Sequence, residues 1–109
     1  MLGSYKKSIG IFGGSFDPAH QGHLKISLVS IKKLKLAKLY WIITNKNPFK
    51  KKSYFTLKKR IQISKKITKK NKKIKVIFLE KIVKSNKAVD ILKYFIKKNK
   101  NSKLFFIIG

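Results

Sequence analysis

The segment Ile9–Leu24 (IGIFGGSFDPAHQGHL) places an apolar strand, a glycine pair and two histidines directly ahead of a helix. Ile9–Phe12 has the apolar run of a buried strand. Gly13 and Gly14 then allow a tight backbone turn and the close approach of a ligand, because neither carries a Cβ. Apolar residues recur after the histidines at helical spacing, at Leu24, Leu28, Ile31 and Leu34.

The predicted helix begins near Gly22 and His23, immediately after the loop. The first N–H groups of a helix have no partner within it, and its N-terminus carries the positive end of the helix dipole. A strand, a glycine turn and a helix start in this order therefore favour a bound phosphate.

His20 and His23 are separated by Gln21 and Gly22 (H-x-G-H) and are the only histidines in the chain. One ring can lie on the loop and the other on the first helical turn, both directed at the same anion. Each imidazole can donate a hydrogen bond, and either can become cationic beside a phosphate near neutral pH. The spacing also fits a helix-capping loop with two solvated histidines, and spacing alone does not separate these readings.

Strand and helix patterns alternate along the chain, which predicts right-handed crossovers and a parallel sheet with helices on its faces. The four predicted strands are Ile9–Phe12, Lys38–Thr44, Ile74–Leu79 and Leu104–Ile108. A second helix is expected to begin near Thr56, and Val89, Leu92 and Phe95 mark a third.

The expected architecture is a single Rossmann-like α/β domain over residues 1–109. Ligands of such sheets bind at the carboxyl ends of the strands. The glycine and histidine motif and the polar loop Asn45–Lys52 should therefore line one cleft.

The chain is strongly basic, with 29 lysine and arginine residues against 3 acidic ones and a net charge of +26. Such a charge ordinarily indicates nucleic acid. Arg60 is the only arginine, however, whereas a dedicated phosphate-binding surface uses arginine for bidentate contacts. The lysine, isoleucine, asparagine and aromatic residues that dominate are those of A/T-rich codons. We therefore predict no specific nucleic-acid partner, only weak, salt-sensitive association with RNA.

Other compositional features exclude several classes of protein. No stretch approaches the roughly 18 consecutive apolar residues of a membrane span, and the N-terminal apolar run is too short for a signal peptide. The absence of cysteine excludes disulfides and thiolate metal sites. We expect a cytoplasmic protein with no membrane partner.

The ordered string Gly13–Pro18 (GGSFDP) followed by His20-x-Gly22-His23 resembles the signature of the HxGH nucleotidyltransferases, most closely nicotinate-nucleotide adenylyltransferase. Phosphopantetheine adenylyltransferases generally have threonine at the position of His20. They remain an alternative, as do the cytidylyltransferases, which share both histidines. The resemblance covers essentially the whole chain but only the N-terminal half of a family member, so it implies a truncated form of that family's fold.

The resemblance implies transfer of AMP from ATP to nicotinate mononucleotide, which forms nicotinate adenine dinucleotide and releases pyrophosphate. Mg²⁺ would arrive with ATP and be held chiefly by its phosphates and water, with no protein metal site. The catalytic residues implied are His20 and His23. The implied ATP-binding residues are Gly13, Gly14, Ser15, Phe16, His20 and His23, and the implied substrate-binding residues are Ser15, Asn45, Lys50 and Arg60. Asp17 is expected to fix the loop rather than to act as a base.

Two segments bear on the acceptor substrate. Asn45–Lys50 resembles a family segment ending in Pro-Pro-His-Lys, with Phe49 in place of the histidine, and Lys50 is its candidate phosphate ligand. Lys87 and Ala88 stand where the family usually has polar and aromatic residues that receive the nicotinate ring. Arg60 resembles a following family arginine that either clamps phosphate or anchors the loop.

Two further alternatives remain open. Family members continue beyond the position of Gly109 with residues that contact the pyridine ring and ATP. The chain can therefore be an inactive nucleotide-binding remnant instead of an enzyme. A truncated sheet would expose a hydrophobic edge, which favours self-association.

Overall fold

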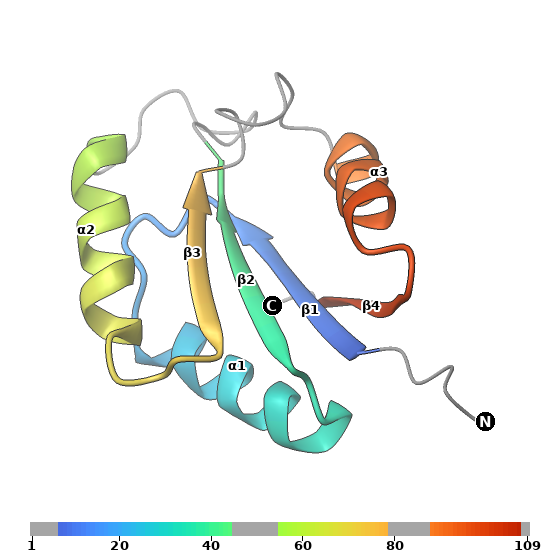
Figure 1. Ribbon diagram of the computed structural model, residues 1–109. Helices are drawn as coiled ribbons and strands as arrows, with labels where there is room; N and C mark the ends of the chain where they lie inside the picture. The colour runs from blue at the N-terminus through green and yellow to red at the C-terminus, as the bar shows by residue number, and fades with distance from the viewer. Residues whose placement is uncertain (1–6, 45–54, 79–87, 108–109) are drawn as a thin grey trace.

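The computed structural model describes residues 7–44, 55–78 and 88–107. Strands and helices alternate through these residues, as the sequence predicts (Figure 1). Their bounds are β1 (Lys7–Gly14), α1 (Gln21–Leu34), β2 (Lys38–Ile43), α2 (Leu57–Thr68), β3 (Ile74–Phe78), α3 (Ala88–Lys98) and β4 (Ser102–Ile107). No helix within the described ranges has both the length and the apolar character needed to cross a bilayer.

The strands form one parallel sheet in the order β3-β2-β1-β4. The predicted Rossmann-like α/β class is therefore confirmed. Figure 1 shows the carboxyl ends of β1, β2 and β3 at the same edge of the sheet. At this edge the Thr44 N–H donates to the Gly14 carbonyl at 3.0 Å, which joins the end of β1 to the segment after β2.

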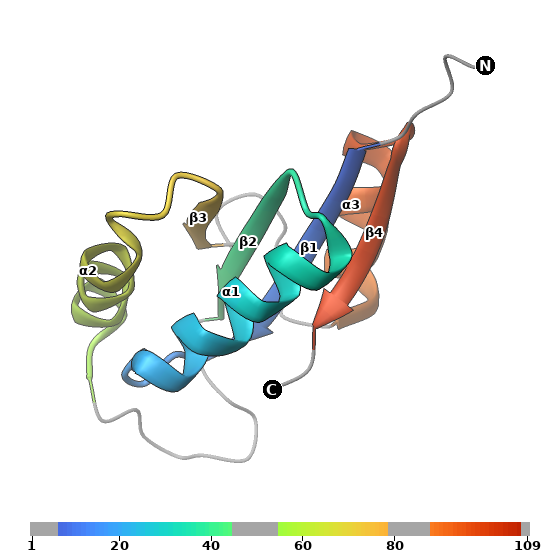
Figure 2. The same cartoon turned by 90° about the horizontal axis from the view of Figure 1, so that it is seen from below.

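Helices cover both faces of the sheet, with α1 and α2 on one face and α3 on the other (Figure 2). Strand residues alternate between these faces. The α1 and α2 face includes the buried residues Phe12, Leu39, Trp41, Ile43 and Ile74, and the α3 face includes Ile11, Ile42 and Phe95. Because β2 is a central strand buried on both faces, its sequence is a continuous apolar run.

Gly10 lies where the connection from α1 packs over β1. A Cβ added to Gly10 would lie 2.5 Å from Leu39 Cδ1 and 2.7 Å from Leu36 Cδ1. Both leucines are buried. Glycine at this position therefore lets the two leucine side chains lie directly on the strand.

The turn after β1 differs from the prediction. Gly13 and Gly14 pair in register with Ile42 and Ile43 and belong to the strand rather than to the turn. No glycine in the described residues has a positive φ, and the left-handed residue of this loop is Phe16, with φ of 47°. Burial of the Phe16 side chain, which is 3% exposed, offsets the cost of that conformation.

The buried face of α1 also differs from the prediction. Leu24, Ile31 and Leu34 pack against the core as expected, but Leu28 is 42% exposed and Ser27 is fully buried. A serine occupies the core position because its hydroxyl accepts a hydrogen bond from a buried indole N–H, that of Trp41, at 2.8 Å. Apolar spacing alone carries no sign of such a polar pair.

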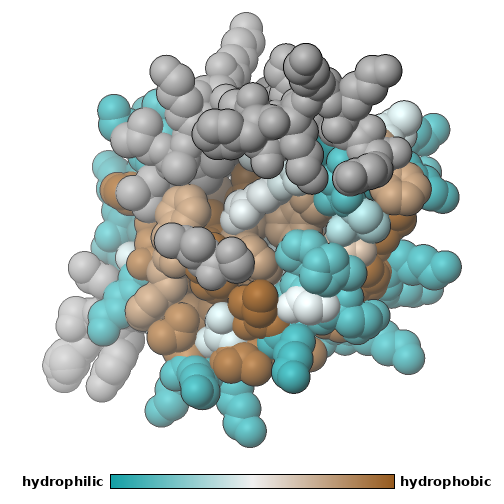
Figure 3. Space-filling model, turned by 180° about the vertical axis from the view of Figure 1, so that it is seen from behind, coloured by the Kyte–Doolittle hydropathy of each residue, from teal (hydrophilic) through white to brown (hydrophobic). Residues whose placement is uncertain are grey.

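Other element boundaries shift by one or two residues. The described part of β4 begins at Ser102 rather than Leu104, and β2 ends at Ile43 rather than Thr44. Apolar side chains reach the surface on the face in Figure 3. On α1 the exposed apolar residues are Ile26, Leu28 and Val29. Self-association stays a prediction.

Candidate functional site

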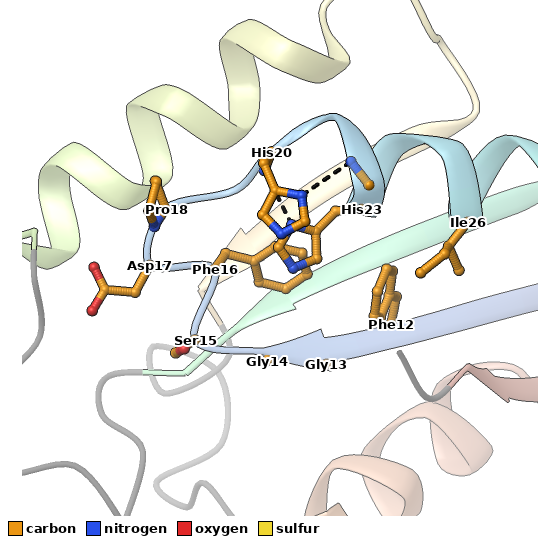
Figure 4. Close-up of a pocket in the computed structure, with 11 residues that line it drawn as sticks. Phe12, Gly13, Gly14, Ser15, Phe16, Asp17, Pro18, His20, His23 and Ile26 are labelled. Atoms are coloured by element: carbon orange, nitrogen blue, oxygen red, sulfur yellow. Dashed lines mark hydrogen bonds between the residues drawn. The ribbon is translucent and has the colours of Figure 1, made fainter.

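A cavity of about 560 Å³ opens at the carboxyl end of β1, beside the first turns of α1 (Figure 4). Its lining includes all six predicted ATP-binding residues, namely Gly13, Gly14, Ser15, Phe16, His20 and His23. Phe12, Asp17, Pro18, Gly22 and Ile26 complete the lining. The sequence motif and the sheet topology therefore converge on one pocket.

The two histidines cap the N-terminus of α1 reciprocally. His20 is the N-cap residue, and its Nδ1 accepts a hydrogen bond from the Gly22 N–H at 3.0 Å. His23 Nδ1 in turn accepts from the His20 N–H at 3.1 Å. The alternative of a helix-capping loop is thus correct as structure. The capping residues are also the predicted ligand-binding residues, and both histidines line the pocket.

This capping determines what the rings offer to a ligand. A neutral imidazole has one acceptor nitrogen and one donor nitrogen. Because Nδ1 accepts a backbone hydrogen bond in both rings, we assign the proton of each neutral ring to Nε2. Two Nε2–H donors are therefore available beside the pocket, on rings whose centroids are 4.0 Å apart.

The backbone N–H groups of the helix start are largely occupied. The Gly22 N–H is bound by His20 Nδ1, and the His23 N–H donates to the His20 carbonyl at 3.0 Å. The prediction that free N–H groups of this turn hold a phosphate is therefore wrong for Gly22 and His23. The imidazole Nε2–H groups remain as donors at this helix N-terminus.

The surroundings of His23 favour its neutral form. Burial, and then the nearby His20 imidazole, lower the pKa of His23 below its ordinary value. Protonation would also place a hydrogen on Nδ1, opposite the N–H group that it now accepts from. These contacts favour the neutral ring over the cation that the sequence also allowed.

Asp17 and Arg60 organise the loop beside the pocket. The Asp17 carboxylate is directed away from the two imidazoles in Figure 4, and its Oδ1 accepts from the Phe55 N–H at 2.8 Å. This geometry agrees with the expected loop-fixing role of Asp17.

Arg60 is 1% exposed on α2. Its NH1 group donates to the Ser15 carbonyl at 2.8 Å and to the Thr44 carbonyl at 2.9 Å. Its Nε donates to the Phe55 carbonyl at 3.3 Å. These contacts favour the loop-anchoring alternative, and a contact of Arg60 with a substrate phosphate stays a prediction.

The glycine and histidine motif and the fold agree with known proteins. The cytidylyltransferase-like family matches residues 11–109. The chain belongs to this family. Its membership accounts for the parallel sheet and for the placement of the motif at the end of β1.

Curated relatives of this chain are named after the enzyme family whose signature the glycine and histidine motif resembles. The probable nicotinate-nucleotide adenylyltransferase of Pelagibacter ubique is 49% identical over 108 residues, which are 99% of this chain and 59% of the relative. The protein of the same name from Rhizobium meliloti is 31% identical over 103 residues, 94% of this chain and 54% of the relative. The predicted resemblance is confirmed, and the chain spans a little over half the length of these relatives.

A solved family structure has the same architecture. The Plasmodium falciparum nicotinic acid mononucleotide adenylyltransferase, complexed with NaAD, aligns with a TM-score of 0.74 and 26% sequence identity. The alignment covers 94% of this chain and 52% of that one.

Several predicted residues of this family member lie outside the described residues. Asn45 and Lys50, the other two predicted substrate ligands, are among them, as is Lys87. Among the described residues, no group of three or more histidine, aspartate or glutamate side chains could hold a metal ion.

The sequence did not indicate the apolar side of the pocket. Phe12 and Ile26 line it, and Ile26 is 37% exposed there. Ile26 follows His23 by one helical turn, a spacing that could have placed it beside the ring. Ser27 and Trp41 lie behind these apolar residues. The sequence could not indicate that the two side chains are linked, because the link is a hydrogen bond between distant positions.

Proposed function

We propose that this chain is an adenylyltransferase that transfers AMP from Mg-ATP to nicotinate mononucleotide. One observation carries the proposal: reciprocal capping leaves an Nε2–H donor on each of His20 and His23, beside one pocket. The names of the relatives support the choice of reaction and acceptor. We also propose a cytoplasmic location, where ATP is available.

The proposed reaction needs no covalent protein intermediate. An oxygen of the mononucleotide phosphate forms a bond to the α-phosphorus of ATP. The bond from that phosphorus to the oxygen bridging to the β-phosphorus breaks, and pyrophosphate leaves with the electron pair. Catalysis of this kind rests on positioning and on stabilisation of the charge that moves onto the leaving group.

His20 and His23 would donate from Nε2 to oxygens of the triphosphate. Donors held in place before the reaction stabilise the developing charge without reorganisation. The capping bonds provide this preorganisation, because each fixes its imidazole through Nδ1. In this scheme Mg²⁺ arrives with ATP and is held chiefly by its phosphates and by water.

Asparagine variants separate capping from donation. Asparagine places an acceptor oxygen near the position of Nδ1, so His20→Asn and His23→Asn can retain the helix cap, while neither carries a group at Nε2. We expect His23→Asn to lower the rate of pyrophosphate release from ATP and nicotinate mononucleotide by about a hundredfold to a thousandfold. Its urea unfolding midpoint should stay close to that of the wild type.

The wild-type assay also decides between enzyme and remnant. Pyrophosphate release that depends on nicotinate mononucleotide supports the proposed reaction. ATP binding without pyrophosphate release would identify an inactive nucleotide-binding chain instead. Release supported equally by phosphopantetheine or by a cytidylyl donor would move the chain to a neighbouring branch of the family.

A further inference from the structure

We propose that Trp41 and Ser27 form a buried brace that positions His23 for the reaction. This inference rests on the proposed function for its catalytic consequence. Neither residue lines the pocket. Both act through the residues in front of them, so they are positioning residues rather than catalytic ones.

The brace begins as a chain of hydrogen bonds. The Trp41 Nε1–H donates to Ser27 Oγ at 2.8 Å, and the Ser27 hydroxyl donates to the His23 carbonyl at 2.8 Å. Trp41 and Ser27 are each 0% exposed. A buried hydrogen bond of this kind is costly to leave unmade, so the pair holds β2 and the first turns of α1 at a fixed separation.

Aromatic rings extend the brace to the His23 side chain. The Phe16 ring stacks on the Trp41 ring, with centroids 4.9 Å apart and planes inclined by 19°. The Phe16 ring also contacts the His23 ring, and the two ring centroids are 4.8 Å apart. His23 also lies 6.0 Å from Trp41 in an edge arrangement. Besides this direct contact, Trp41 is thus connected to His23 by two indirect routes. One runs through Ser27 to the His23 backbone carbonyl, and the other runs through the Phe16 ring to the His23 ring.

The two routes explain two departures from local preference. A serine stands at a core position of α1, and Phe16 adopts a left-handed backbone conformation without being glycine. Each departure brings a group into contact with Trp41. Because both groups also contact His23, the arrangement fixes a histidine that lines the pocket.

Two single variants and their combination test the brace. Trp41→Phe keeps an aromatic ring but removes the N–H, and Ser27→Ala removes the connecting hydroxyl. Tyr40→Phe is the matched control, because Tyr40 is the adjacent residue on β2 and packs on the opposite face against Phe95. The double variant leaves neither polar partner buried and unpaired, so it serves where a single variant fails to fold.

The first readout is kinetic. We expect Trp41→Phe and Ser27→Ala each to lower kcat about tenfold with little change in the KM for ATP, and Tyr40→Phe to leave both values unchanged. The double variant should be no slower than either single variant, because all three interrupt the same connection. Unchanged kcat in folded Trp41→Phe and Ser27→Ala would overturn the brace.

The second readout does not depend on turnover. NMR of the histidine rings in the full chain should show that Trp41→Phe and Ser27→Ala shift the His23 signals more than those of His20. His23 signals that remain at their wild-type positions would overturn the proposal even if the chain has no activity. Shifted signals in a chain without turnover would support the brace while rejecting the proposed reaction.

Discussion

Two Nδ1 atoms decide, at the scale of single residues, what the site offers to a ligand. His20 and His23 accept backbone hydrogen bonds through these atoms, and each ring keeps one proton on Nε2. The spacing of the two histidines predicts where their rings lie, and the family resemblance implies their function. Their protonation pattern could not be predicted, because it depends on which N–H group each nitrogen meets in the folded loop.

The lowered pKa of His23 has a consequence for stability. The unfolded chain takes up a proton near the ordinary histidine pKa of about 6.5, before the folded chain does. The contribution of neutral His23 to the free energy of unfolding should therefore be fully present above that pH. It should fall as the pH drops toward the lower pKa of folded His23.

Urea unfolding at stepped pH values between about 8 and about 5 measures this dependence. The chain has only 3 acidic residues and 2 histidines, so comparison with a variant that lacks the His23 imidazole isolates its contribution. His23→Asn, which has no imidazole, should show a flatter profile. Equal slopes in the two proteins would contradict the assignment to His23.

Among the secondary-structure elements, Arg60 links α2 to the segments that follow β1 and β2. From α2 it donates to carbonyls of the loop after β1, of Thr44 after β2 and of Phe55 before its own helix. Alternating periodicity predicts that these elements exist, and Thr56 marks the start of α2 as expected. The end of β1 could not be predicted, because pairing with β2 extends the strand through two glycines.

Replacing Arg60 tests whether it anchors the loop. Arg60→Met removes the bonds to the Ser15 and Thr44 carbonyls, and a hydrogen bond from a charged donor contributes about 1.5–3 kcal/mol. We expect the free energy of unfolding in urea to fall by about 3 kcal/mol. Arg60→Lys should recover only part of this loss, because lysine lacks the planar fork.

Lys59→Met is the matched control for Arg60→Met, since Lys59 is the preceding residue of α2 and is exposed. Its effect should stay within about 0.5 kcal/mol. An Arg60→Met chain as stable as Lys59→Met, but with weakened ATP binding, would reject the anchoring role. Arg60 would then be the phosphate clamp that the family resemblance also allows.

In the whole molecule, the candidate site lies at the carboxyl end of a parallel sheet. The alternation of strands and helices predicts this class of fold and the converging strand ends. It does not predict the order β3-β2-β1-β4, which depends on contacts between segments far apart in the sequence. The aligned relatives are longer, with this chain spanning 52% to 59% of three of them. Activity of this chain by itself is therefore the prediction that most needs a direct measurement.

Isothermal titration calorimetry of Mg-ATP into the wild-type chain and into folded His23→Asn tests the central claim most directly. The account predicts saturable binding to the wild type at constant salt. It also predicts binding at least about tenfold weaker in His23→Asn, because one hydrogen bond from His23 to the triphosphate is lost. Equal affinity in the two proteins, or no heat with the wild type, would contradict a phosphate site built on the histidine pair.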